Sequence, residues 1–179
     1  MIADRWLRVL ETPGTDDVYA FSLCSVWSRR ALLLFESEQG SREVMPRIAI
    51  GGRYAAFTLR SCHGGDHDSY EGCRVFVKAY DAKRRRGWKT ALPSPGLDTR
   101  PGAVTSLVVT ARGWTAWAGF RTNFSTLEVW AMAPGGAVRK LAEGPTDALP
   151  ADSVNDMLAV NGDRLYWQFG ETPGTAVLR

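Results

Sequence analysis

Thr105-Ser-Leu-Val-Val-Thr110 and Gly113-Trp-Thr-Ala-Trp-Ala-Gly-Phe120 open the most complete structural unit of the chain, Val104 to Gly144. Two more runs, Thr126–Ala133 and Ala137–Glu143, complete it. Turn residues rich in Gly, Pro, Asn and Ser separate the runs, and apolar or aromatic residues alternate within them. A period near two indicates short strands joined by hairpins. The unit therefore predicts a four-stranded antiparallel meander, which is the size of one β-propeller blade.

The same pattern recurs along the chain, which predicts a repeat protein. An aliphatic strand, a Gly turn with an Arg, and an aromatic strand occur at Ile48–Phe57, Leu107–Trp117 and Leu158–Trp167, with a weaker copy at Val18–Cys24. Self-similarity of this size indicates stacked units that cannot bury their faces alone. We expect one all-β domain with four approximate units: 1–46, 47–103, 104–152 and 153–179. The alternative is a β-sandwich whose hairpins are similar by coincidence.

The two ends of the chain share a further motif. Glu-Thr-Pro-Gly-Thr occurs at Glu11–Thr15 and at Glu171–Thr175, each time after an aromatic strand that begins with Asp-Arg. Pro and Gly stand there where a type II turn requires them, so both copies predict turns. The last unit lacks an outermost strand, and the Arg5–Leu10 run has no full unit of its own. We therefore expect the two ends to meet, within one molecule or between two.

Composition limits the function classes. The chain has 179 residues, is 45% hydrophobic and carries a formal net charge of +3, with acidic and basic residues interspersed. This balance favours neither nucleic acid nor a membrane surface as a partner. No apolar run approaches the roughly 20 residues of a membrane span, and no signal peptide is visible at the N-terminus. The chain is therefore expected to be cytosolic or to be a mature form.

The repeats resemble the blades of bacterial β-propellers of the TolB-like or quinoprotein-like kind. The resemblance rests on the hairpin pattern and on Arg60-Ser-Cys62, a polar loop, and Cys73–Asp81 followed by Gly87, as in blades with a cysteine pair across one hairpin. It covers most of the chain, but propeller repeats host unrelated activities. The chain holds about four units, fewer than those families usually have. The resemblance thus implies a small ring, or a half-ring that a second copy completes.

The cysteines bear on the compartment. Cys62 ends one predicted strand and Cys73 begins the next, so a hairpin brings them within disulfide range. A Cys62–Cys73 disulfide implies an oxidising, extracytoplasmic or secreted location. The alternative is a pair of reduced cysteines in the cytoplasm, which the missing signal peptide favours. Cys24 is left over, and we interpret it as a small buried hydrophobe.

One cluster carries potential chemistry. His63, Asp66, His67, Asp68 and Glu71 gather both histidines of the chain with three carboxylates. Such a set suits zinc or another transition metal, and the nearby cysteines are conceivable additional ligands. His-x3-His places both rings on one side only in a helix, however, and this segment is predicted to be a loop. A solvated loop without metal is the preferred interpretation.

Other motifs point to surface contacts. Lys83-Arg-Arg-Arg86 is either a phosphate-binding patch or, as we prefer, a solvated hairpin tip. Trp27 and Trp88 lie near predicted turns, which makes them the candidates for exposed contact with a glycan, whereas the other strand tryptophans are expected in the core. No nucleotide-binding loop is present, and histidine occurs only in the 63–67 cluster, which excludes a Ser-His-Asp triad elsewhere.

The sequence thus predicts a non-enzymatic binding or structural module of propeller-like blades. We expect no catalytic residues and no cofactor. The predicted partner is a protein or a carbohydrate, and homo-oligomers are expected if two chains share their open edges. The alternative function is a metal-dependent hydrolase or lyase that uses the His63–Glu71 loop.

Overall fold

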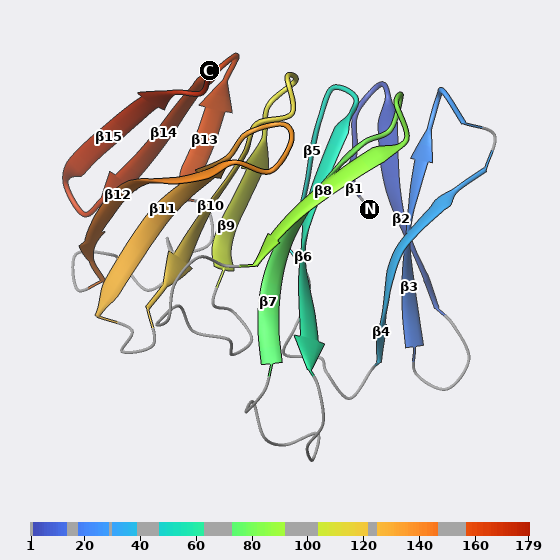
Figure 1. Ribbon diagram of the computed structural model, residues 1–179, viewed down its shortest axis with the longest axis horizontal. Helices are drawn as coiled ribbons and strands as arrows, with labels where there is room; N and C mark the ends of the chain where they lie inside the picture. The colour runs from blue at the N-terminus through green and yellow to red at the C-terminus, as the bar shows by residue number, and fades with distance from the viewer. Residues whose placement is uncertain are drawn as a thin grey trace.

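The computed structural model describes residues 2–13, 18–28, 30–38, 47–62, 73–91, 104–121, 125–146 and 157–179. All regular elements in these ranges are β-strands (Figure 1). A search of the described residues for a helix long and apolar enough to cross a membrane found none. The all-β prediction is therefore confirmed for this part of the chain.

The strands form four antiparallel sheets, and each sheet follows the order of the chain. Sheet 1 contains β1 (Ile2–Ala3), β2 (Leu7–Pro13), β3 (Val18–Ser25) and β4 (Leu32–Glu38). Sheet 2 contains β5 (Ile48–Gly51), β6 (Tyr54–Cys62), β7 (Cys73–Asp81) and β8 (Arg86–Ala91). Sheet 3 contains β9 (Val104–Val109), β10 (Thr115–Phe120), β11 (Thr126–Met132) and β12 (Val138–Pro145). Sheet 4 contains β13 (Leu158–Asn161), β14 (Arg164–Phe169) and β15 (Thr172–Val177).

The predicted central meander is present in sheet 3. Strands β10 and β11 are antiparallel neighbours, and Trp117 pairs directly with Trp130. In sheet 4, β13 and β14 form a hairpin whose turn residues are Gly162 and Asp163, and Gly162 has a φ of 60°.

The sheets stack face to face (Figure 1). Each contact between consecutive sheets has its own cluster of buried hydrophobic residues. Leu7, Val9 and Phe21 of sheet 1 pack on Ala55 and Phe57 of sheet 2. A second cluster joins sheet 2 to sheet 3, and a third joins sheet 3 to sheet 4. Four stacked sheets differ from the two sheets of a β-sandwich.

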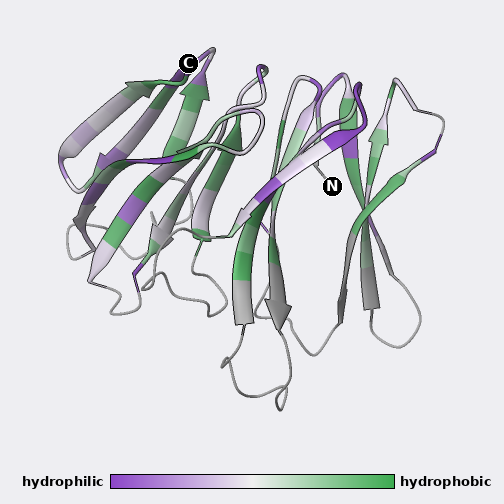
Figure 2. Ribbon diagram, in the orientation of Figure 1, coloured by the Kyte–Doolittle hydropathy of each residue, from purple (hydrophilic) through white to green (hydrophobic). Residues whose placement is uncertain are grey.

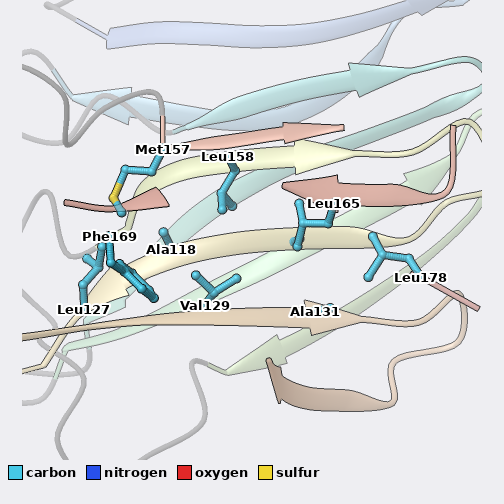
Figure 3. Close-up of a cluster of buried hydrophobic side chains, with 10 residues drawn as sticks. Ala118, Leu127, Val129, Ala131, Met157, Leu158, Leu165, Phe169 and Leu178 are labelled. Atoms are coloured by element: carbon cyan, nitrogen blue, oxygen red, sulfur yellow. The ribbon is translucent and has the colours of Figure 1, made fainter. Parts of the chain in front are cut away.

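The contact between sheets 3 and 4 shows how each sheet presents one row of side chains to the next. Figure 3 shows Val129 and Ala131 of β11 lying beside Leu165 and Leu178 of sheet 4. Leu165 is fully buried, whereas its neighbour Arg164 is exposed on the opposite face. Because sheets 2 and 3 are covered on both sides, they bury both rows of side chains, and the terminal sheets bury one.

The repeated sequence pattern corresponds to one structural position. Ile48–Phe57, Leu107–Trp117 and Leu158–Trp167 contain the hairpins formed by the first two strands of sheets 2, 3 and 4. These first strands lie close together: a Cβ at Gly51 would collide with the carbonyl oxygen of Val109. The weaker copy, Val18–Cys24, is not equivalent, because it contains β3, the third strand of sheet 1.

Two predictions about the chain ends are wrong. Arg5–Leu10 does belong to a full unit, since β2 is the second strand of the four-stranded sheet 1. Thr172–Thr175 forms β15 and not a turn. The bond from Leu178 N–H to the carbonyl of Asp163 shows that Pro173 turns its missing N–H away from β14, toward the open edge. Gly174 is required because Trp167 covers its Cα.

The first Glu-Thr-Pro-Gly-Thr copy is also extended where it is described. Glu11, Thr12 and Pro13 form the end of β2 and pair with β3. The rest of this copy lies outside the described residues. Pro is tolerated at a strand end or on an edge strand, which accommodates both Pro13 and Pro173.

Candidate functional site

The loop with the candidate metal ligands, for which a solvated loop without metal was the preferred interpretation, is not part of the described chain. His63, Asp66, His67, Asp68 and Glu71 all lie outside the described residues. Among the residues that are described, no group of three or more His, Cys, Asp or Glu side chains is positioned to hold a metal ion. The metal hypothesis therefore gains no support from the described geometry.

The backbone places Cys62 directly opposite Cys73 at the end of the β6–β7 hairpin. The register is continuous, and Ala82 N–H donates to the carbonyl of Arg53 at 3.0 Å in the same ladder. Because hydrogen-bonded and non-bonded pairs alternate, Cys62 and Cys73 form a non-hydrogen-bonded pair. In such pairs the Cα atoms are about 4.5 Å apart, which is within the range of a disulfide. The two side chains themselves are outside the described structure.

Asp81 stabilises the β7–β8 turn that carries the basic run Lys83–Arg86. Its carboxylate is buried, accepts hydrogen bonds from the backbone N–H groups of Lys83 and Arg84 at 3.0 Å each, and forms an ion pair with Arg53 at 3.1 Å. Lys83–Arg86 is exposed at the hairpin tip. This arrangement matches the solvated-tip interpretation and shows a structural role for the buried carboxylate.

A second buried carboxylate, Glu128 of β11, was not recognised in the sequence. It accepts a hydrogen bond from Trp130 Nε1 at 3.0 Å and forms ion pairs with Arg121 at 3.1 Å and Lys140 at 3.4 Å. The three partners neutralise and saturate the carboxylate, so it has a structural role. The sequence does contain a signal for this burial. Glu128 shares one side of its strand with Trp130 and Met132, so this acidic residue stands in a row of large hydrophobic side chains.

Lys140 also bonds the exposed Glu143 at 2.7 Å. This hydrogen bond is the main cause that raises the pKa of Lys140 above its ordinary value. The same bond lowers the pKa of Glu143. The pair is solvent-exposed and contributes little to stability.

The two tryptophans singled out from the sequence differ in their surroundings. Trp27 is 38% exposed and stacks on Trp6, with ring centroids 5.5 Å apart. Trp88 packs against the cluster between sheets 2 and 3 and contacts Tyr54 edge-on at 6.0 Å. Of the two, Trp27 presents the more accessible aromatic surface.

Exposed large hydrophobic side chains occur only on the terminal sheets, within the described part of the chain. Sheet 1 and the β3–β4 turn carry Leu10, Val26, Trp27 and Leu33, and sheet 4 carries Tyr166 and Val177. Leu10 and Leu33 flank Ser22 in one cross-strand row on the side of sheet 1 that points away from sheet 2. We call this side the outer face of sheet 1. Cys24 lies on it in a half-buried position, so it is not a core residue.

The outer face of sheet 4 is the counterpart at the other end of the stack. Tyr166 and Val177 lie there, each about 41% exposed, on neighbouring strands. Strand β15 is the edge of this sheet, and Arg139 of β12 donates a hydrogen bond to the carbonyl of Val177 at 3.1 Å. The geometry therefore offers two uncovered sheet faces, one at each end, as the candidate site for a protein partner.

A scan against protein-family models and a search of curated proteins each found no match for this chain.

Proposed function

We propose that this chain is a non-enzymatic, propeller-like binding and structural module whose outer faces bind protein, with a second copy of the chain as the partner. One observation carries the proposal: the exposed large hydrophobic side chains of the described residues are confined to the two terminal sheets. Exposed apolar side chains that gather in one region mark interaction sites.

The stack itself favours a second copy as the occupant. Each internal contact joins one face of a sheet to the facing side of the next sheet in the chain. The outer face of sheet 4 and the outer face of sheet 1 are the two faces left over. In a two-fold dimer, each copy presents the outer face of sheet 1 to the outer face of sheet 4 of its partner. Such an assembly is a ring of eight sheets, in agreement with the resemblance to propeller blades.

The oligomeric state tests the proposal. Light scattering on a sizing column should give twice the monomer mass of 19.7 kDa. Leu10→Glu places a charge on the outer face of sheet 1 and should give monomers with unchanged circular dichroism. Ala137→Glu makes the same charge change in an exposed turn of sheet 3 and should remain dimeric. A wild-type monomer at high concentration, or a dimeric Leu10→Glu variant, would overturn the proposal.

A glycan is the second candidate partner. The observation in its favour is the Trp6–Trp27 stack, over which the Arg5 guanidinium lies 4.6 Å from the Trp6 ring. A rigid aromatic pair suits stacking on a sugar ring. Tryptophan fluorescence with a panel of soluble oligosaccharides tests this, since Trp27→Ala should abolish the response and Val26→Ala should preserve it.

The cellular compartment of the protein depends on whether Cys62 and Cys73 form a disulfide. If Cys62 and Cys73 are joined, the module works in an oxidising compartment outside the cytoplasm. The metal-dependent hydrolase alternative depends on the His63–Glu71 loop, which is outside the described residues, and remains a hypothesis from the sequence.

A further inference from the structure

We propose that a cleft between sheets 1 and 2 binds a small carboxylate with an apolar body. The cleft has a volume of about 210 Å³. Leu32, Leu33 and Leu34 of β4 line it from sheet 1, and Phe57, Lys78, Tyr80 and Gly87 line it from sheet 2. Apart from Leu33, which also belongs to the outer face of sheet 1, the lining residues lie between sheets 1 and 2 and not on the outer faces.

The cleft exists because a glycine stands where a side chain would fill it. Gly87 of β8 pairs directly with Tyr80 of β7. A Cβ at position 87 would lie 3.3 Å from the Ala79 carbonyl oxygen, 3.4 Å from the Tyr80 ring and 4.0 Å from the Lys78 Cε. The missing side chain therefore leaves the ring and the lysine stem open to a ligand.

The positive charge of Lys78 in the cleft favours an anionic ligand. Lys78 is half-buried, and its Nζ lies over the ring of the buried Phe57, 5.6 Å from the centroid. Within the described structure, Lys78 has no carboxylate partner. A cation–π contact compensates only part of the cost of burying an ammonium group.

A second lysine adds to the positive charge near the cleft. Lys89 of β8 stands directly opposite Lys78, and its Nζ lies 5.1 Å from the Phe76 centroid. Like charges directly opposite each other are destabilising. No carboxylate of the described residues pairs with Lys89 either. In Figure 2, β8 shows purple, hydrophilic bands that alternate with paler ones. An anion between the strands would relieve the repulsion.

The rest of the lining defines the body of the ligand. The leucines and Phe57 form apolar walls, and the Tyr80 hydroxyl has no hydrogen-bond partner among the described residues. A cavity of about 150 Å³ holds benzene, and drug-sized ligands need about 300 Å³ or more. The cleft thus suits one aromatic ring or a short alkyl chain. The ligand carboxylate would form an ion pair with Lys78 Nζ and accept a hydrogen bond from the Tyr80 hydroxyl.

Octanoate is the probe that tests the proposal, with 1-octanol and acetate as matched controls for charge and apolar body. We expect octanoate to bind with a Kd of about 1 mM or tighter. Amide signals of Leu34, Tyr80 and Gly87 should shift, and both controls should bind at least about tenfold more weakly. Equal binding of octanol, or octanoate shifts confined to other residues, would overturn the proposal.

Variants separate the specific site from general attraction to a basic protein. Lys78→Gln should weaken octanoate about tenfold, and Lys78→Arg should retain it. Lys83→Gln makes the same charge change at the exposed tip of the same hairpin and should have less than about a twofold effect. Gly87→Ala should weaken binding sterically. Equal losses in the Lys78→Gln and Lys83→Gln variants, both folded by circular dichroism, would refute a built site.

Discussion

The prediction that the structure sharpens most is the Cys62–Cys73 disulfide. The register and the Ala82-to-Arg53 hydrogen bond place the two cysteines in a non-hydrogen-bonded pair. Because the Cα spacing of such a pair, about 4.5 Å, already allows a disulfide, the bond needs no backbone movement. Slippage of the hairpin by one residue would lose this match.

The stability that the bond contributes follows from the loop it closes. For a loop of about ten residues, the chain-entropy model gives about 2.7 kcal/mol at 25 °C. For a domain of this size, each kcal/mol corresponds to about 2–4 °C in Tm. We therefore expect reduction to lower the Tm of the wild-type protein by roughly 5–10 °C.

Two measurements check this prediction. Peptide mapping under non-reducing conditions should find Cys62 linked to Cys73, with Cys24 free. Thermal unfolding with and without reductant should differ for the wild type and for Cys24→Ser, but not for the Cys62→Ser/Cys73→Ser double variant. Three free thiols in protein purified from an oxidising compartment, or a Tm that reductant leaves unchanged, would refute the reasoning.

Four further predictions concern packing and charge. Leu165→Ala should cost about 2–5 kcal/mol in urea unfolding, because Leu165 is fully buried between sheets 3 and 4, whereas Arg164→Ala on the other face should stay within about 0.5 kcal/mol. Gly51→Ala should lower the Tm because its Cβ would collide with the Val109 carbonyl, whereas Lys89→Ala, at an exposed position of the same sheet, should not. NMR titration should give Glu143 a pKa below its ordinary value, and this pKa should rise in Lys140→Met, which removes the hydrogen bond. The stability that the pair contributes is present above the unfolded-state pKa of Glu143 and is lost as the pH falls through the lower folded-state pKa. His63→Ala/His67→Ala should leave the Tm within about 1 °C and make it no more sensitive to a chelator; a large fall reproduced by chelator would favour the metal hypothesis.

Local pattern was sufficient for the strands and for the equivalent hairpins. Alternating runs and a Gly turn appear in the sequence of Leu158–Trp167, and the structure forms β13 and β14 there. These features are decided by residues close in sequence, through the period of two and the turn conformation at Gly162. The prediction therefore needed no knowledge of neighbouring sheets.

What failed depended on contacts distant in sequence. Glu128 alternates with apolar residues, a pattern that normally puts the polar row in solvent. It is buried because sheet 3 has a sheet on both sides and because Arg121 and Lys140 reach its carboxylate. Pro173 and Gly174 look like a turn, but the open edge of β15 accepts the proline and Trp167 requires the glycine. The cleft at Gly87 likewise depends on how sheet 1 packs against sheet 2.

The two outer faces are unequal, and this difference bears on the strength of any contact between copies. The outer face of sheet 1 presents Leu10 and Leu33, which is 52% exposed, around a central serine, with the exposed Arg8 beside Cys24 on the same face. On sheet 4, Tyr166 and Val177 share the outer face with the exposed Arg164, and an arginine from sheet 3 occupies the Val177 carbonyl. Internal contacts between sheets are built on clusters of buried hydrophobic side chains. A contact between outer faces should therefore resemble a dissociable interface more than a protein core, with its apolar anchor on sheet 1.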